Sequence, residues 1–151
     1  MTELIATVII TTSSVALFAY WFRYTCLLIL SAKTTRDYAA SVANANQLNF
    51  LQVQSLLRDR GAADLDSMRD SLDRDYNVLT YLLKHAANPS TGDAAIEKRM
   101  LEIDYRLMGA WYSMSRRFSP TAARRALDEM STVIAHFANS MGERAIAGAS
   151  A

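Results

Sequence analysis

Hydrophobic and polar positions divide this chain of 151 residues into one uninterrupted apolar stretch and a longer region of regularly spaced apolar residues. The apolar stretch covers residues 4–22 and contains no charged side chain. A helix of about 19 residues is roughly 30 Å long, which matches the thickness of a bilayer's hydrocarbon core. The pattern therefore predicts a single-pass transmembrane helix near the N-terminus, with the lipid bilayer as a partner.

Aromatic residues mark the end of this stretch. Tyr20, Trp21, Phe22 and Tyr24 surround Arg23, a composition that is typical of a membrane interface. A span that ends near position 22 keeps the arginine out of the hydrocarbon, where a central Arg costs about 2.5–3.5 kcal/mol. Cys26 and the apolar residues 27–30 then lie in the headgroup zone or pack on a partner. We therefore assign residues 1–31 to a transmembrane anchor and interface segment, 32–148 to a helical bundle and 149–151 to a disordered tail.

A cleavable signal peptide is the alternative to an anchor. Such a peptide begins with basic residues and ends at a small-x-small cleavage site. Here the N-terminus carries Glu3, and Leu30 occupies a position where the best cleavage candidate requires a small residue. We favour an uncleaved anchor. Because Arg23, Lys33 and Arg36 follow the span and no basic residue precedes it, we expect the N-terminus outside and the bundle in the cytoplasm.

Hydroxyl side chains occupy the middle of the span, at Thr11, Thr12, Ser13 and Ser14. Small hydroxyl residues allow two membrane helices to approach and to form hydrogen bonds across the interface. The same hydroxyls can instead bond to carbonyls of their own helix. These four residues are candidate transmembrane contacts with a membrane-protein partner or a second copy of the chain.

Four segments of the remaining chain, residues 34–58, 62–87, 93–118 and 120–147, carry apolar residues alternately three and four positions apart. Such a stripe is typical of the buried face of an amphipathic helix. In the third segment the stripe consists of Ile96, Met100, Ile103, Leu107, Trp111, Met114 and Phe118. Short connections favour antiparallel neighbours, so we predict an all-α fold with an up-down antiparallel bundle of three to four long helices. The first segment has the weakest stripe, and two interpretations are open: a bundle helix, or a stalk that continues the membrane helix.

Two helix starts are marked in the sequence. Ser119 is a natural N-cap with Pro120 at the first helical position. Thr91 or Asp93 can cap the preceding segment. These signals predict that one helix begins near position 120 and another near position 93.

The up-down topology gathers basic residues at one end of the bundle. They are Arg58, Arg60, Arg116, Arg117, Arg124 and Arg125. Two interpretations are open: a binding site for an acidic partner or ligand, or a solvated tip with local ion pairs that contribute little. The net charge of the whole chain is +1, so we expect no general affinity for nucleic acid or anionic lipid.

The sequence contains no signature of catalysis. Neither His85 nor His136 has a glutamate three positions before it, as a diiron bundle requires, and both flank the apolar stripes. The single cysteine cannot form an internal disulfide, which agrees with a reducing compartment. We predict no catalytic, cofactor-binding or metal-ligating residue and do not expect an enzyme.

Three functional hypotheses follow from this pattern. The first is a membrane-anchored helical bundle that acts as a structural or accessory interaction subunit of a membrane complex. The second is a membrane-tethered sensor or adaptor whose arginine-rich tip binds an acidic ligand or partner. The third is haem or small-molecule binding in the bundle interior, with His85 and His136 as the available haem ligands.

Overall fold

The computed structural model describes residues 1–32, 36–59, 64–86 and 92–150. Within these residues it contains six α-helices and no strand, which confirms the all-α prediction. The chain divides into two compact units, Met1–Ala32 and Lys33–Ala151. The first unit is one helix, and the second contains the other five.

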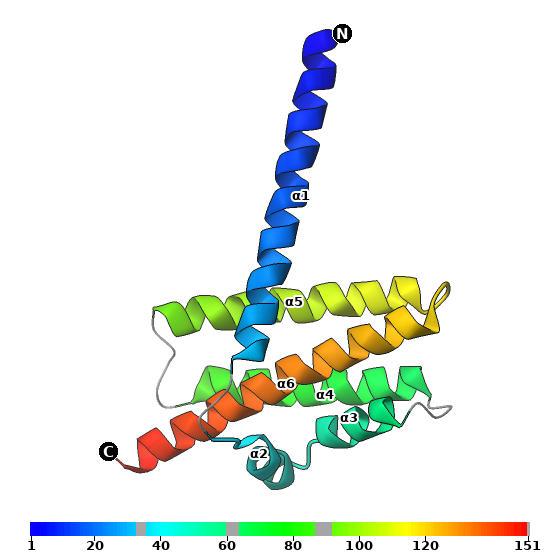
Figure 1. Ribbon diagram of the computed structural model, residues 1–151. Coiled ribbons are helices and arrows are strands. Elements are labelled where there is room, and N and C mark those ends of the chain that lie inside the picture. The colour runs from blue at the N-terminus through cyan, green and yellow to red at the C-terminus, as the bar shows by residue number, and fades with distance from the viewer. Residues whose placement is uncertain (33–35, 60–63, 87–91, 151) are drawn as a thin grey trace. The chain divides into compact units, whose positions relative to one another are not determined.

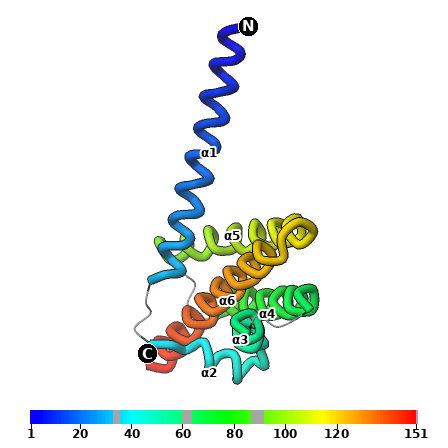
Figure 2. The backbone as a smooth tube through the Cα atoms, turned by 45° about the vertical axis from the view of Figure 1, so that its right-hand side comes forward, coloured from blue at the N-terminus to red at the C-terminus, as the bar shows by residue number. Residues whose placement is uncertain are grey.

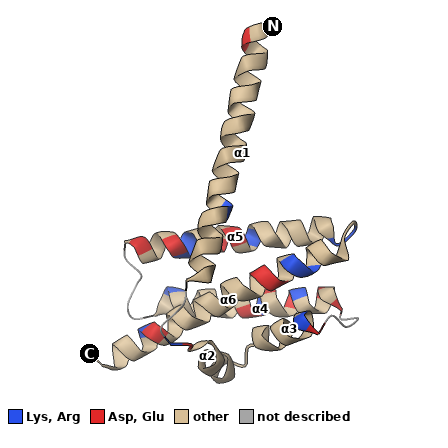
Figure 3. Ribbon diagram, viewed as in Figure 1, with Lys and Arg blue, Asp and Glu red and all other residues tan. Residues whose placement is uncertain are grey.

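Helix α1 runs from Thr2 to Ser31 and carries charged residues only at Glu3 and Arg23 (Figure 3). It is long and apolar enough to cross a membrane, a criterion that an N-terminal signal sequence also meets. The helix continues for nine residues beyond Phe22, where the predicted membrane span ends. The rings of Tyr20 and Tyr24 stack one turn apart, with their centroids separated by 6.3 Å.

The second unit consists of two short helices followed by three long ones. They are α2 (Ala39–Asn46), α3 (Phe50–Arg58), α4 (Leu65–His85), α5 (Asp93–Ser115) and α6 (Pro120–Ala149). α6 lies at the centre and packs against each of the other four, as Figures 1 and 2 show from two directions. α5 and α6 are joined by a short turn and run in opposite directions.

Apolar residues of α6 form the middle of the core. The predicted stripe of this helix is buried, with Leu127, Met130 and Ile134 fully inaccessible and Phe137 nearly so. The stripe of α4 is buried as well, at Met68, Leu72, Leu79 and Leu83. For these two helices the prediction that the stripe faces the core is confirmed.

The single long helix predicted over residues 34–58 is wrong, although its first two positions lie outside the described residues. The chain breaks into α2 and α3 at Gln47, whose backbone adopts the left-handed conformation with φ of 52°. The first N–H groups of α3, those of Asn49 and Phe50, donate to Oδ2 of Asp75 on α4 at 2.6 and 2.7 Å. A side chain 26 positions away therefore caps the new helix, a contact that the local sequence does not encode.

Burial shapes the chemistry of this cap. Asp75 is fully buried, and burial raises its pKa above the ordinary value, while the two backbone N–H groups and Arg74 act in the opposite direction. The stripe of the first segment is nevertheless buried on both sides of the break, at Ala39, Val42 and Phe50 among others. This burial supports the interpretation that the segment belongs to the helical unit rather than to a stalk.

The other helix ends match the sequence signals in part. Ser119 caps α6 by accepting a hydrogen bond from the N–H of Ala122, with Pro120 in the first turn, as predicted. α5 begins at Asp93 with Gly92, not Asp93, at the N-cap position, while Thr91 lies outside the described residues. α5 ends at Ser115, three residues before the predicted end. α6 extends to Ala149, the first residue of the expected tail.

A close approach fixes α2 against α6. The N–H of Tyr38 donates to Oδ1 of Asn139 at 2.8 Å. One turn further along α6, Gly142 lies directly under Tyr38, and a Cβ placed on the glycine would stand 2.3 Å from the tyrosine Cβ. The contact therefore requires glycine at position 142.

Candidate interaction surfaces

The predicted stripe of α5 faces solvent, so its assignment to the core is wrong. Ile96 is 62% exposed, Ile103 54% and Met114 53%, and the three other large side chains of the row, at Leu107, Trp111 and Phe118, are exposed too. Met100 is half-buried. We call the exposed row from Ile96 to Phe118 the α5 apolar face.

The face that α5 buries is mixed in character. It contains Leu101 and Met108 but also Asp104, Tyr105 and Tyr112, all less than 8% exposed. Tyrosine combines a large apolar ring with a hydroxyl that can bond to a polar neighbour. α5 therefore turns its tyrosines inward, where α4 supplies the polar neighbours.

Two acidic residues of α4 accept hydrogen bonds from these tyrosines. The hydroxyl of Tyr112 donates to Asp66 at 2.7 Å, and Arg116 pairs with the same carboxylate oxygen. The hydroxyl of Tyr105 donates to Asp73 at 2.8 Å. Since higher numbers on α5 meet lower numbers on α4, the two helices are antiparallel.

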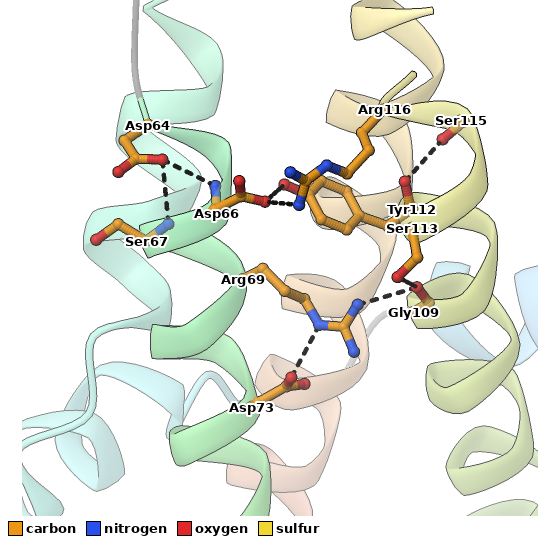
Figure 4. A network of polar contacts seen from close by, with 10 residues as sticks. All are labelled: Asp64, Asp66, Ser67, Arg69, Asp73, Gly109, Tyr112, Ser113, Ser115 and Arg116. Atoms are coloured by element: carbon orange, nitrogen blue, oxygen red, sulfur yellow. Dashed lines mark hydrogen bonds and ion pairs between the residues drawn. The ribbon is translucent and has the colours of Figure 1, made fainter. Parts of the chain in front are cut away.

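An arginine of α4, Arg69, lies between Asp66 and Asp73 (Figure 4). Nε of Arg69 bonds to Asp73 at 2.9 Å, and its Nη1 donates to the carbonyl oxygen of Gly109 at 3.0 Å. A Cβ on Gly109 would stand 2.7 Å from the guanidinium, so glycine gives the arginine room to reach the α5 backbone. The guanidinium also lies 5.8 Å from the centre of the Tyr112 ring. A charged residue therefore bridges the two helices in place of an apolar contact.

Burial and the acidic partners change the titration of both tyrosines. Burial, followed by the hydrogen bond to Asp66, raises the pKa of Tyr112 to about 12. Burial raises the pKa of Tyr105 further, and the bond to Asp73 acts in the same direction. The ring of Tyr105 also stacks on Tyr76 with centroids 3.9 Å apart. These contacts hold the phenols in their neutral form.

Arginines border the α5 apolar face. Arg99 and Arg106 are exposed along one edge of the row, and Arg116 and Arg117 are exposed directly before its last residue, Phe118. From position 96 to position 118, the exposed charged residues are arginines, while Glu97 and Glu102 are half-buried and pair with His136 and Lys98. The face is therefore apolar in the middle and basic at the edge.

The structure brings together some of the arginines that were predicted to gather at one end of the bundle. Three of them line one open groove of about 630 Å³ between the end of α3 and the start of α6. The groove residues are Leu57, Arg58, Thr121, Arg124, Arg125 and Asp128. Arg116 pairs instead with Asp66, Arg117 is exposed in the turn after α5, and Arg60 lies outside the described residues. We call this cavity the arginine groove.

The hydroxyls predicted as transmembrane contacts lie together in the middle of α1. Thr11, Thr12, Ser13 and Ser14 are exposed within that unit. Elsewhere in α1, Thr7 and Thr25 donate to carbonyls four residues earlier in their own helix. Both interpretations of the mid-span hydroxyls therefore stay open.

The two histidines contact different partners. Nδ1 of His85 lies 2.8 Å from the carbonyl oxygen of Tyr81, and Nε2 of His136 lies 2.8 Å from Glu97. His136 borders a cavity of about 270 Å³ whose other lining includes Glu97, Lys98 and Phe137. This volume is below the range of about 300–1,000 Å³ that is usual for small-molecule sites. Among the described residues, no three His, Cys, Asp or Glu side chains are grouped to hold a metal ion.

Comparison with protein-family models, with curated proteins and with solved structures gives no significant match to this chain.

Proposed function

We propose that this protein is a membrane-anchored interaction protein with a structural or accessory role in a membrane complex. In this proposal α1 crosses the bilayer once with its N-terminus outside, and the second unit is an up-down helical bundle on the cytoplasmic side. The length and composition of α1 support the anchor, and the basic residues after it support the orientation.

The observation that carries the proposal is the α5 apolar face. A monomeric soluble domain rarely leaves a contiguous row of large apolar side chains exposed, and such rows mark interaction sites. Here five large apolar residues of α5, and Phe118 in the turn directly after it, are at least 44% exposed. The second unit is therefore incomplete by itself and is built to be covered when it functions.

Crosslinking of the tagged full-length protein in gently solubilised membranes tests this proposal. We expect the protein to resist extraction by alkaline carbonate and to form a stoichiometric crosslink with another membrane protein or a second copy. Release by carbonate, or an absence of crosslinks from the second unit, would refute the accessory role.

The arginine groove supports a second candidate function, an adaptor that binds an acidic partner or ligand. Three arginines and one acidic residue, Asp128, are among the residues that line a cavity of about 630 Å³. Guanidinium groups bind carboxylates and phosphates in a bidentate geometry. Salt-sensitive capture of an acidic partner by the wild type, lost in Arg58→Gln/Arg125→Gln, would favour this function. Equal capture by both proteins would exclude it.

A further inference from the structure

The α5 apolar face has the composition of a helix that lies in a membrane interface. Trp111 is 45% exposed near the middle of the row, between aliphatic side chains at Ile103, Leu107 and Met114. Interfacial helices place tryptophan and aliphatic residues in the boundary between headgroups and acyl chains, and arginine or lysine on the polar edge. With Arg99 and Arg106 along its edge, α5 has each of these parts.

A second copy of the chain fits this face less well. Pairing two α5 helices through the apolar row would bring two rows of arginines together. The acidic residues of this stretch offer little compensation, because Glu97 pairs with His136 and Glu102 with Lys98. Like charges that face each other across an interface are destabilising. Phosphate groups of lipids supply negative charge that is free to face the arginines.

In the proposed function, the anchor tethers the second unit to the membrane. α1 ends at Ser31 and the second unit begins at residue 33, so a spanning α1 tethers the unit within a few residues of the bilayer. Tethering turns a weak contact into an intramolecular one with a high effective concentration. The net charge of +1 gives the chain no general affinity for anionic lipid, but the exposed charged residues beside this face are arginines.

We propose that the α5 apolar face lies on an anionic leaflet of the bilayer that α1 crosses. The side chains of Ile103, Leu107 and Trp111 enter the headgroup boundary, and Arg99 and Arg106 bind lipid phosphates. The contact rests on the proposed function, because α1 must hold the second unit at the membrane. It fixes the orientation of the unit and leaves the arginine groove for other partners.

The two tryptophans of the chain give each unit its own reporter. In the full-length Trp21→Phe variant, Trp111 alone reports on the α5 apolar face. We would reconstitute this variant into vesicles of phosphatidylcholine with phosphatidylglycerol, or of phosphatidylcholine alone, each with and without brominated acyl chains. We expect Trp111 to be quenched by bromine and protected from acrylamide in the anionic vesicles, and much less in the neutral ones.

Charge variants test the role of the arginines. A basic residue at an anionic surface contributes roughly a five-fold gain in binding, so Arg99→Gln/Arg106→Gln should weaken the contact about 30-fold. The matched control is Arg58→Gln/Arg125→Gln, which removes the same charge from the arginine groove. We expect this control to leave the Trp111 signal unchanged.

The reciprocal variant, Trp111→Phe, separates failure of this inference from failure of the proposed function. If Trp21 in α1 is not quenched by bromine in either lipid, the anchor and with it the proposed function fail. If Trp21 is quenched while Trp111 stays open to acrylamide in anionic vesicles, only the lipid contact is refuted. Protection of Trp111 that disappears when protein is diluted into excess lipid would also refute it, because a second copy would then be the occupant.

Discussion

Helices α5 and α6 are consecutive in the chain and pack against each other, and both carry apolar residues at the same helical spacing. In α6 this stripe is at most 2% exposed from Ala123 to Phe137, whereas in α5 it is mostly exposed. The same pattern therefore has two outcomes in one small unit. A stripe indicates that a helix face must be covered, but it does not say whether the covering group belongs to the same chain.

The neighbours of each helix explain the difference. α6 is surrounded by four helices, which together cover its apolar residues. α5 also packs on α6, through its other face, and on that face Tyr105 and Tyr112 bond to acidic residues of α4 and Arg69 reaches the backbone at Gly109. Apolar packing holds α6 in place, and a polar network connects α5 to α4.

Leucine-to-alanine substitutions in the two stripes give the largest expected contrast. Leu127 on α6 is fully buried and Leu107 on α5 is 44% exposed. Leu127→Ala should lower the free energy of unfolding by about 2–5 kcal/mol, because it leaves a cavity. Leu107→Ala should change it by no more than about 0.5 kcal/mol. Urea unfolding of the full-length protein in mild detergent, followed by circular dichroism, measures both, and similar losses from the two variants would break the comparison.

The cap of α3 tests whether a buried polar contact can matter as much as apolar packing. Asp75→Ala leaves the N–H groups of Asn49 and Phe50 without their acceptor, so we expect a loss of about 2–3 kcal/mol in the free energy of unfolding. Asp75→Asn keeps an acceptor oxygen and removes a buried charge whose pKa is raised by burial, so it should recover most of this loss. The same urea titration compares the two variants, and an equal loss from both would show that the charge itself is required.

The sequence predicts the fold well where the determinants are local. The stripes of α4 and α6 and the Ser119 cap depend on residues within a few turns, and all are found where they were expected. The break at Gln47 depends on Asp75, which lies in another helix, so the pattern over residues 34–58 could not reveal it. The arginine groove follows from helix directions alone, while the pairing of Arg116 with Asp66 depends on side-chain geometry.

The α5 apolar face was missed because the apolar stripe was assumed to be the buried one. A second pattern was present in the sequence: Asp66, Arg69 and Asp73 on α4 repeat every three to four residues, as do Tyr105, Gly109 and Tyr112 on α5. In antiparallel helices these rows match as donors and acceptors. A search for complementary polar rows would therefore have indicated which face of α5 turns inward.

The close contact at Gly142 sharpens the description of α6 as a tightly enclosed helix. A Cβ at this position would meet the Cβ of Tyr38, which cannot move without the backbone, so Gly142→Ala should cost about 1–3 kcal/mol. Gly148 lies in the same helix with no atom within 4 Å of an added Cβ. Gly148→Ala should therefore stabilise the helix by up to about 1 kcal/mol. Thermal unfolding of both variants tests whether Gly142→Ala lowers the stability and Gly148→Ala raises it. A stabilising Gly142→Ala would show that α2 is free to move.

The smallest expected effect concerns the polar attachment of α5, and its sign depends on pH. The pKa of Tyr112 is raised to about 12 in the folded protein, above the ordinary value of 10.0. A group whose pKa is raised on folding stabilises the fold fully below its unfolded pKa, and this stability is lost as pH rises toward the folded pKa. Tyr112→Phe removes the hydrogen bond to a half-exposed carboxylate, which costs about 1 kcal/mol at pH 7. The cost should shrink as pH rises from about 10 to 12, because the wild-type phenol itself then ionises.

Urea titrations at a series of pH values from neutral to alkaline measure how the difference in unfolding free energy between the wild type and Tyr112→Phe shrinks. Tyr81→Phe is the matched control, since Tyr81 is 63% exposed on α4, and it should keep the alkaline slope of the wild type. A Tyr112→Phe variant with the same alkaline slope as the wild type would show that the bond to Asp66 does not stabilise the unit. The attachment of α5 would then rest on its packing against α6, with Leu101 and Met108 buried, and the polar network would no longer distinguish α5 from α6.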